Sequence, residues 1–305
     1  MADRSFTGNE CWVYGANAVD QLAGHHATLI ADALGVQEPV TCLVYSPRRG
    51  AEAGPFGLQA PSGSHALAVT GTRFITTYDS HCPGKAPEVR SAPFDNVLTV
   101  VIGEALTLGW FAVRSVQRGR PTTETIVFSS HGIEHFRAAV RAWRRTTFVS
   151  GADNGEGLRA HSLASQIPPF LWSQLAPLVL ADEPLFAAVH GRETWLPSRS
   201  RRWRCTSPWA CCLVTGGGLL IGQSEAPLEP GGLVFGVNVT CVDQRAIHRI
   251  SLAPIAGNGD SGTTLAVEIR AGHATQDVSI QLGGMSPAGI RESLAHVSSR
   301  VEVAR

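Results

Sequence analysis

Residues 65–78 read HALAVTGTRFITTY and residues 210–222 read ACCLVTGGGLLIG, and in each an apolar run turns through Val-Thr-Gly into a second apolar run. Such runs, joined by a glycine turn, are typical of two adjacent β-strands. The spacing between the two Val-Thr-Gly turns also separates Glu38 from Glu183, within the alignable stretches ADALGVQEPVTCLV (31–44) and APLVLADEPLFAAV (176–189). The sequence therefore contains two copies of one unit, with a period too long for a solenoid.

The length of the chain, 305 residues, is more than one hydrophobic core usually organises. Near the end of each copy, Gly132-Ile133 corresponds to Gly289-Ile290 at a longer spacing, so the second copy contains a few extra residues. A segment rich in Gly, Ser, Asn and Asp separates the copies. We expect an irregular lead-in over residues 1–17, a first domain over 18–145, a linker over 146–165 and a second domain over 166–305.

Each copy has the same expected order of elements: a short leading helix, about seven strands and a closing helix. The leading helices are predicted within 18–35 and around 170–180, and the closing helices carry Ile133, Phe136, Val140 and Trp143, or Ile290, Leu294 and Val297, on one face. Strands grouped before a single helix indicate an antiparallel, mainly β fold. The predicted strands are 40–45, 66–70, 73–78, 97–102, 111–113 and 125–128, then 185–189, 211–215, 219–221, 246–252, 265–270 and 278–282.

The two quoted fragments, each followed by a hairpin region and a C-terminal helix, resemble bacterial pleckstrin-homology-like (PH-like) domains. The resemblance covers roughly residues 31–145 and 176–300 and contains no catalytic signature. It implies a mainly β protein with two tandem PH-like β-barrel or sandwich domains, each closed by its C-terminal helix. It also implies that the loop after the first strand of each copy binds anions, as the corresponding loop of eukaryotic pleckstrin-homology domains often does with phosphorylated lipid head groups.

Arginine gathers in this loop in both copies. Guanidinium groups present a planar fork of donors that suits phosphate, and tryptophan beside arginine can insert at a membrane surface. The alternative is a solvated loop whose tryptophans pack between domains. The candidate anion- or partner-binding residues are Arg48 and Arg49 in the first copy, and Arg192, Arg199, Arg201, Arg202, Arg204 and Trp203 in the second, where Trp195 and Trp209 are interleaved. A further cluster, Arg141, Arg144 and Arg145, ends the first closing helix, where the helix dipole favours cations.

Composition excludes several function classes. The formal net charge is zero, which argues against a general nucleic-acid-binding surface. No stretch is apolar and long enough to cross a bilayer, and the N-terminus leads into polar sequence, so we expect a cytoplasmic protein. The seven cysteines have no recurring spacing and do not suggest a disulfide framework or a metal site. No cofactor is expected.

Gly259-Asp260-Ser261-Gly262 resembles the nucleophile motif of trypsin-like serine proteases, with His81 as a candidate base and Asp95 or Asp153 as a third member. The usual continuation is glycine and proline, whereas Thr263-Thr264 follows here. The repeat offers a simpler account, because this segment corresponds to a hairpin of the first copy, and a Gly-, Asn- and Asp-rich tip suits a tight turn.

These observations favour a non-catalytic binding or scaffolding protein. Its expected partner is another protein or, alternatively, an anionic membrane surface contacted through the arginine–tryptophan loop of the second copy. Self-assembly through exposed aromatic side chains is a further expectation. The alternative in a different class is a trypsin-like serine hydrolase that uses Ser261.

Overall fold

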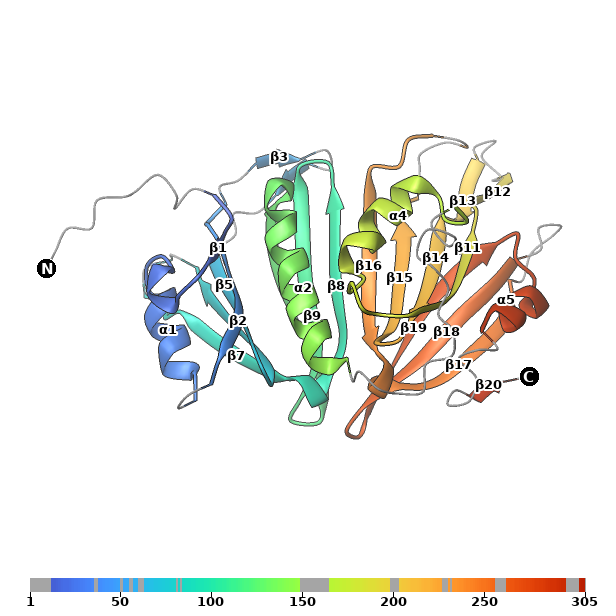
Figure 1. The fold of residues 1–305 in the computed structure, drawn as a ribbon. Helices are drawn as coiled ribbons and strands as arrows, with labels where there is room; N and C mark the ends of the chain where they lie inside the picture. The colour runs from blue at the N-terminus through green and yellow to red at the C-terminus, as the bar shows by residue number, and fades with distance from the viewer. Residues whose placement is uncertain are drawn as a thin grey trace, which may run out of the picture.

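The computed structural model describes most of the chain as an antiparallel, mainly β protein (Figure 1). The prediction of a mainly β fold is confirmed. The described residues are 12–35, 38–49, 52–54, 57–59, 63–80, 82, 84–148, 165–197, 203–226, 230, 232–255, 262–294 and 302–304.

The first half begins with a short strand and a leading helix, continues through strands, and closes with the helix α2. Its elements are β1 (Tyr14–Ala16), η2 (Val19–Gln21), α1 (His26–Ala33), β2 (Val40–Ser46), β3 (Glu52–Gly54), β4 (Gly57–Gln59), β5 (Ser64–Thr70), β6 (Arg73–Asp79), β7 (Glu88–Pro93), η3 (Phe94–Asn96), β8 (Val97–Ala105), β9 (Leu108–Gln117), β10 (Arg120–Ser129), η4 (Ser130–Gly132) and α2 (Ile133–Thr147).

The second half repeats this order from its leading helix to its closing helix. Its elements are α4 (Pro169–Leu175), η5 (Ala176–Leu178), β11 (Leu185–Gly191), β12 (Thr194–Pro197), β13 (Trp203–Ser207), β14 (Ala210–Thr215), β15 (Gly218–Ser224), β16 (Gly236–Asp243), η6 (Gln244–Ala246), β17 (Ile247–Pro254), β18 (Gly262–Ala271), β19 (Ala274–Gly283), α5 (Pro287–Leu294) and β20 (Glu302–Ala304).

The strands β7 and β16 are the longest of those that were not predicted from the sequence. Both precede a 3-10 helix. Each is the fourth main strand of its half, after β2, β5 and β6 in the first half and after β11, β14 and β15 in the second. The leading helix of the first half is also shorter than predicted, since Gly24 at φ +59° separates η2 from α1. A glycine in this left-handed conformation interrupts a helix.

The duplication extends to irregularities of the backbone. A register shift between Val40 and Cys42, where β2 pairs with β5, recurs between Leu185 and Ala187. A second shift, between Val97 and Thr99 on β8, recurs between Ile247 and Arg249 on β17. Because a bulge occupies a specific place in a ladder, recurrence at equivalent positions indicates that the two halves share one backbone plan.

The sheets do not divide at the midpoint of the chain. The first sheet has the order β1-β2-β5-β6-β7, and the second has the order β10-β9-β8-β16-β15-β14-β11, so three strands of the first half continue into four of the second. The junction is antiparallel, from Gly236 opposite Ala105 to Cys241 opposite Val100. In Figure 1 the green first half and the orange second half meet where β8 runs beside β16. A four-stranded sheet, β19-β18-β17-β20, completes the second half.

No sheet of the described strands closes on itself, so of the two predicted alternatives, barrel or sandwich, the structure supports sandwich-like packing of open sheets. The main core includes Phe74 and Trp143 of the first half together with Leu175 and Leu213 of the second. All six residues of β14 are buried, because its two faces belong to different cores. This explains why the second quoted run is continuously apolar instead of alternating.

Both closing helices cover cores, as predicted. Phe136, Val140 and Trp143 of α2 are buried in the shared core, and Ile290 and Leu294 of α5 are buried in the second one. The predicted face of α5 also included Val297, which lies outside the described residues. The predicted domain limits stay a prediction: α2 continues to Thr147, and residues 149–164 of the proposed linker lie outside the described residues.

Candidate binding surface and the contact between the halves

One end of the seven-stranded sheet gathers turns from both halves (top of Figure 1). The amide of Leu106, in the turn between β8 and β9, donates to the carbonyl of Phe235 at 3.1 Å. The amide of Ser130, after β10, donates to the carbonyl of Thr107 at 2.9 Å. On the other side of β16, Ser224 donates through its amide to the carbonyl of Trp209 at 2.8 Å. Six strand ends therefore meet at this end of the sheet.

Apolar side chains are exposed at this end of the sheet. Leu106 is 51% exposed, Leu233 is 77% exposed and Phe235 is 43% exposed. Five large hydrophobic side chains are exposed in the described part of the chain, and these three come together through the contact between Leu106 and Phe235. Leu106 has a φ of +53°, a conformation that is uncommon outside glycine and that places it at the tip of the hairpin. We name Leu106, Leu233 and Phe235 the apolar tips.

The predicted arginines lie at the same end wherever they are described. Arg48 is exposed, and Nη1 of Arg49 donates to the carbonyl of Phe128, at the end of β10, at 3.1 Å. Arg192 follows β11 and is exposed, and its amide donates to the carbonyl of Gly283 at 3.1 Å. Arg49 and Arg192 therefore lie at the same end of the seven-stranded sheet but on its two opposite sides, beside the outermost strands β10 and β11.

The remaining candidates belong to a two-stranded ribbon, β12–β13, which leaves the sheet after Arg192. Trp203 and Arg204 lie on β13, and the structure describes only their backbone. Arg199, Arg201 and Arg202 lie outside the described residues. Trp209 is partly buried in the shared core, and its ring meets that of Phe170 edge-on at 6.1 Å. Trp209 thus packs against the core, whereas the alternative prediction was packing between the two domains, and its ring contact with Phe170 lies within the second half.

For Arg144 the predicted explanation was the helix dipole, which favours cations at a helix C-terminus, but its side chain has a different role. Its Nη2 lies 2.5 Å from Oε1 of Glu183, with side-chain exposures of 5% and 0%, and 3.0 Å from Oγ1 of Thr215. Its Nη1 donates to the carbonyl of Leu178. An arginine of the first half thus fills a buried anionic cradle, made by Leu178, Glu183 and Thr215 of the second half. The helix dipole is an insufficient explanation, and this ion pair joins the two halves.

The first half has the same cradle but fills it with its own arginine. Ala33, Glu38 and Thr70 stand where Leu178, Glu183 and Thr215 stand in the second half. Nη2 of Arg73 donates to the carbonyl of Ala33 at 2.9 Å and to Oε2 of Glu38 at 2.5 Å. The position equivalent to Arg73 is Gly218, whose φ is +135° and whose added Cβ would lie 2.0 Å from the carbonyl oxygen of Val242. No side chain fits there, so the second half takes its cation from Arg144.

We expect Arg73→Ala to lower the free energy of unfolding by about 1.5–3 kcal/mol, the range for hydrogen bonds to charged groups. The cost stays moderate because the Arg73 and Glu38 side chains are 27% and 13% exposed, so water can solvate the remaining carboxylate. Urea unfolding of the variant beside wild type measures it. Arg48→Ala, at an exposed site, is the matched control and should change stability by less than about 0.5 kcal/mol.

The same pair predicts an acid-dependent loss of stability. The hydrogen bond from Arg73 is the largest of the causes that lower the pKa of Glu38 from 4.5 to about 2. Because the folded-state pKa lies below the unfolded one, this stabilisation is complete above pH 4.5 and is lost as the pH falls toward 2. Stability measured across that window should fall less steeply in Arg73→Ala than in wild type. Equal slopes would show that the pair does not contribute.

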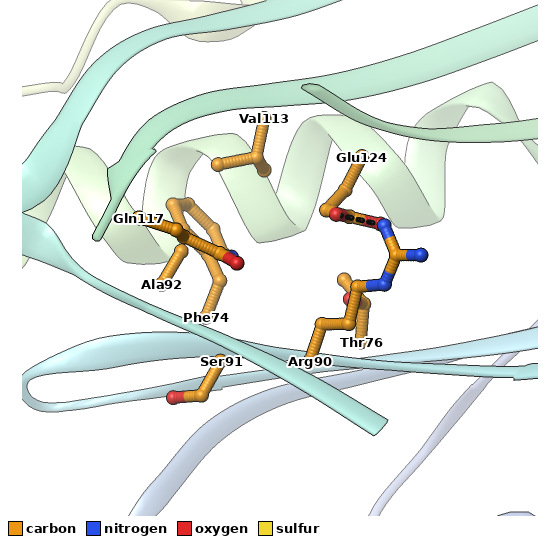
Figure 2. A pocket seen from close by; sticks show the side chains of 8 residues that line it. All are labelled: Phe74, Thr76, Arg90, Ser91, Ala92, Val113, Gln117 and Glu124. Atoms are coloured by element: carbon orange, nitrogen blue, oxygen red, sulfur yellow. Dashed lines mark hydrogen bonds and ion pairs between the residues drawn. The ribbon is translucent and has the colours of Figure 1, made fainter. Parts of the chain in front are cut away.

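A hollow lies between β6 and β7 of the first sheet and β9 and β10 of the second (Figure 2). Its empty volume is about 180 Å³, open solvent included, which is below the size of typical small-molecule sites. Arg90 reaches across it and pairs with Glu124, as Figure 2 shows. We therefore assign the hollow to an ion pair that links the two sheets. It is lined by Phe74, Thr76, Arg90, Ser91, Ala92, Val113, Gln117 and Glu124.

The described residues offer little support for a metal site or for reactive thiols at the buried cysteines. The described residues contain no group of three side chains placed to hold a metal ion. Burial raises the pKa of the Cys211 and Cys241 thiols to about 12, and it also raises that of Cys212. Such thiols are unreactive and pack as small apolar groups.

The hydrolase alternative depends on Ser261 and His81, which both lie outside the described residues, as does Asp153. The flanking residues form a hairpin: the amide of Ile255 donates to the carbonyl of Gly262 at 2.9 Å, and β17 pairs with β18. Asp95 has a 90% exposed side chain at 3.9 Å from Arg245. The hydrolase hypothesis stays untested.

Comparison with protein-family models, curated proteins and solved structures finds no match. Along the described chain, no helix is long and apolar enough to cross a membrane.

Proposed function

We propose that the chain is a non-catalytic binding module built from two PH-like units, and that it docks a protein partner at the end of the seven-stranded sheet. The observation that carries this proposal is the exposure of the apolar tips, Leu106, Leu233 and Phe235, where β8 meets β16, with Arg192 at the same end of the sheet. Exposed apolar groups are typical of protein interaction sites, in which arginine is enriched.

A photo-cross-linking amino acid at position 233, in the otherwise intact chain, tests this proposal. We expect a discrete cross-linked protein that disappears when Leu106 and Phe235 are both changed to serine. The same cross-linker at position 145, an exposed site away from this edge, is the control. Cross-linking that is equal at both positions, or that is unaffected by the serine changes, would contradict a docking site here.

An anionic membrane surface is the second candidate, favoured by the exposed Arg48 and Arg192 at the same end of the sheet as the apolar tips. In a vesicle co-sedimentation assay this candidate predicts recovery with anionic vesicles that exceeds recovery with neutral ones. It also predicts a loss when Arg192, Arg199, Arg201, Arg202 and Arg204 are replaced by serine. Equal recovery with both vesicle types would exclude it.

The non-catalytic part of the proposal has a direct test. A fluorophosphonate probe reacts readily only with an activated serine. Labelling of the wild-type chain that is lost in Ser261→Ala would replace the binding-module proposal with the hydrolase.

A further inference from the structure

In each half, two strands have a backbone edge that can pair with a further strand. The first is the fourth main strand, which is β7 in the first half and β16 in the second. The other is the fifth main strand, which is β8 in the first half and β17 in the second. Within the chain, one fourth-strand edge and one fifth-strand edge pair with each other. β16 of the second half pairs with β8 of the first in an antiparallel ladder, with Val239 opposite Ile102 and Cys241 opposite Val100. The other two edges, those of β7 and β17, lie at opposite ends of the architecture.

The outer edge of β7 is unpaired among the described strands. Val89, in the middle of β7, is 38% exposed. The equivalent residue of β16 is Val239, which pairs with β8, belongs to the shared core and is 3% exposed. The same position is thus exposed where the edge is free and buried where a fifth strand occupies the edge.

The outer edge of β17 holds β20, a strand of only three residues. The pairing is parallel, with Val303 opposite Ile250 and Ala304 opposite Ser251. Parallel pairing is slightly less stable per residue than antiparallel pairing, and a three-residue strand forms few hydrogen bonds. β20 is therefore a weaker occupant of β17 than β16 is of β8.

We propose that the chain self-associates head to tail: β7 of one copy docks on β17 of a second copy, in the antiparallel register that β16 uses on β8, and β20 competes for that edge. The register follows residue by residue from the internal ladder. It places Val89 opposite Leu252 and Ser91 opposite Ile250. Because β20 also pairs with Ile250, the two occupants exclude each other. The proposal does not depend on the proposed function.

On the β7 side of this contact the charges are already neutralised within each copy. Glu88 and Arg90 pair at 2.9 Å, and Arg90 also pairs with Glu124. In the internal contact, Arg144 must enter the cradle of Glu183, whereas the corresponding cradle of the first half is already filled by Arg73. A second copy therefore docks without supplying an arginine to that cradle. Since it also lacks that ion pair, the contact is weaker than the internal one and depends on protein concentration.

The first test releases the β17 edge in the full-length chain. Val303→Pro removes a backbone donor from β20 and disfavours its pairing. In sedimentation velocity at rising protein concentration, we expect the average mass of this variant to increase about twofold or more, while wild type changes less. Adding Val89→Lys should abolish the increase. Trp12→Lys, at another exposed apolar site, is the matched control and should leave it intact.

The second test checks the register. With Cys11 and Cys82 replaced by serine, Val89→Cys combined with Leu252→Cys should form an intermolecular disulfide under mild oxidation. Val89→Cys combined with Ser251→Cys should form far less, because neighbouring residues of a strand point to opposite faces. Removal of residues 302–305 provides a second released variant if Val303→Pro unfolds, as judged by circular dichroism.

A released variant that stays monomeric at every concentration would overturn the proposal. So would association that persists with Val89→Lys, or equal cross-linking by the two cysteine pairs, since either result places the contact elsewhere.

Discussion

Replacing Arg144 with alanine is expected to lower the free energy of unfolding by about 3–5 kcal/mol, the cost of breaking a buried ion pair by removing one partner. The substitution leaves the Glu183 carboxylate, with a side chain 0% exposed, without its cation. It also removes the donors to Thr215 and to the carbonyl of Leu178. The loss should be larger than for Arg73→Ala, because the first cradle is more open to water. Urea unfolding followed by circular dichroism measures both.

Two controls isolate the ion pair. Arg145→Ala changes the neighbouring exposed arginine and should alter stability by less than about 0.5 kcal/mol. Arg144→Met combined with Glu183→Gln removes both charges and keeps an acceptor oxygen for the backbone amide of Gly217, so it should recover part of the loss. If the double variant is as unstable as the sum of the two single variants, the charge interaction is not the cause.

Replacing Trp143 with alanine is expected to lower the free energy of unfolding by about 3–5 kcal/mol, as is typical for a buried aromatic residue. Trp143 is 2% exposed, and its ring lies 6.1 Å from that of Phe74. The surrounding core contains side chains of both halves, among them Leu175 and Leu213. The cavity should therefore weaken both halves at once, and unfolding should remain a single transition for the wild type and the variant.

Trp12, which is 63% exposed, provides the matched control, and Trp12→Ala should change stability by less than about 0.5 kcal/mol. Differential scanning calorimetry distinguishes the two arrangements of the chain. Two separate transitions, of which Trp143→Ala shifts only one, would show that the halves fold independently and would contradict the shared core.

Much of the β architecture could be predicted from local pattern. The apolar runs at 66–70 and 211–215, with their glycine turns, correspond to β5 and β14, and the alignment of Glu38 with Glu183 holds in three dimensions as two equivalent cradles. The strand β7 was missed because it lies at a sheet edge, where Glu88, Val89 and Arg90 are exposed and no alternation of apolar residues is required. In β16, alternating Val237, Val239 and Cys241 were a usable signal that the prediction overlooked.

The candidate surface was predictable only in part. Clustering of arginine drew attention to Arg192 and the following ribbon, but nothing in sequence spacing brings Arg49 to the end of β10 or Leu106 to Phe235. The apolar tips were missed altogether. Their signal, isolated leucine and phenylalanine residues in loops, is common in buried positions as well, so exposure must be observed before it carries information.

The sequence by itself determined the duplication, the mainly β class and the positions of most strands, because these follow from short-range apolar periodicity and glycine turns that each segment contains. The tertiary structure alone decided how the two copies combine. Pairing β16 with β8 merges their sheets, and Gly218, which cannot carry a side chain, makes the second copy depend on Arg144 of the first. Both outcomes depend on edges and charges that meet across the fold, between residues far apart along the chain.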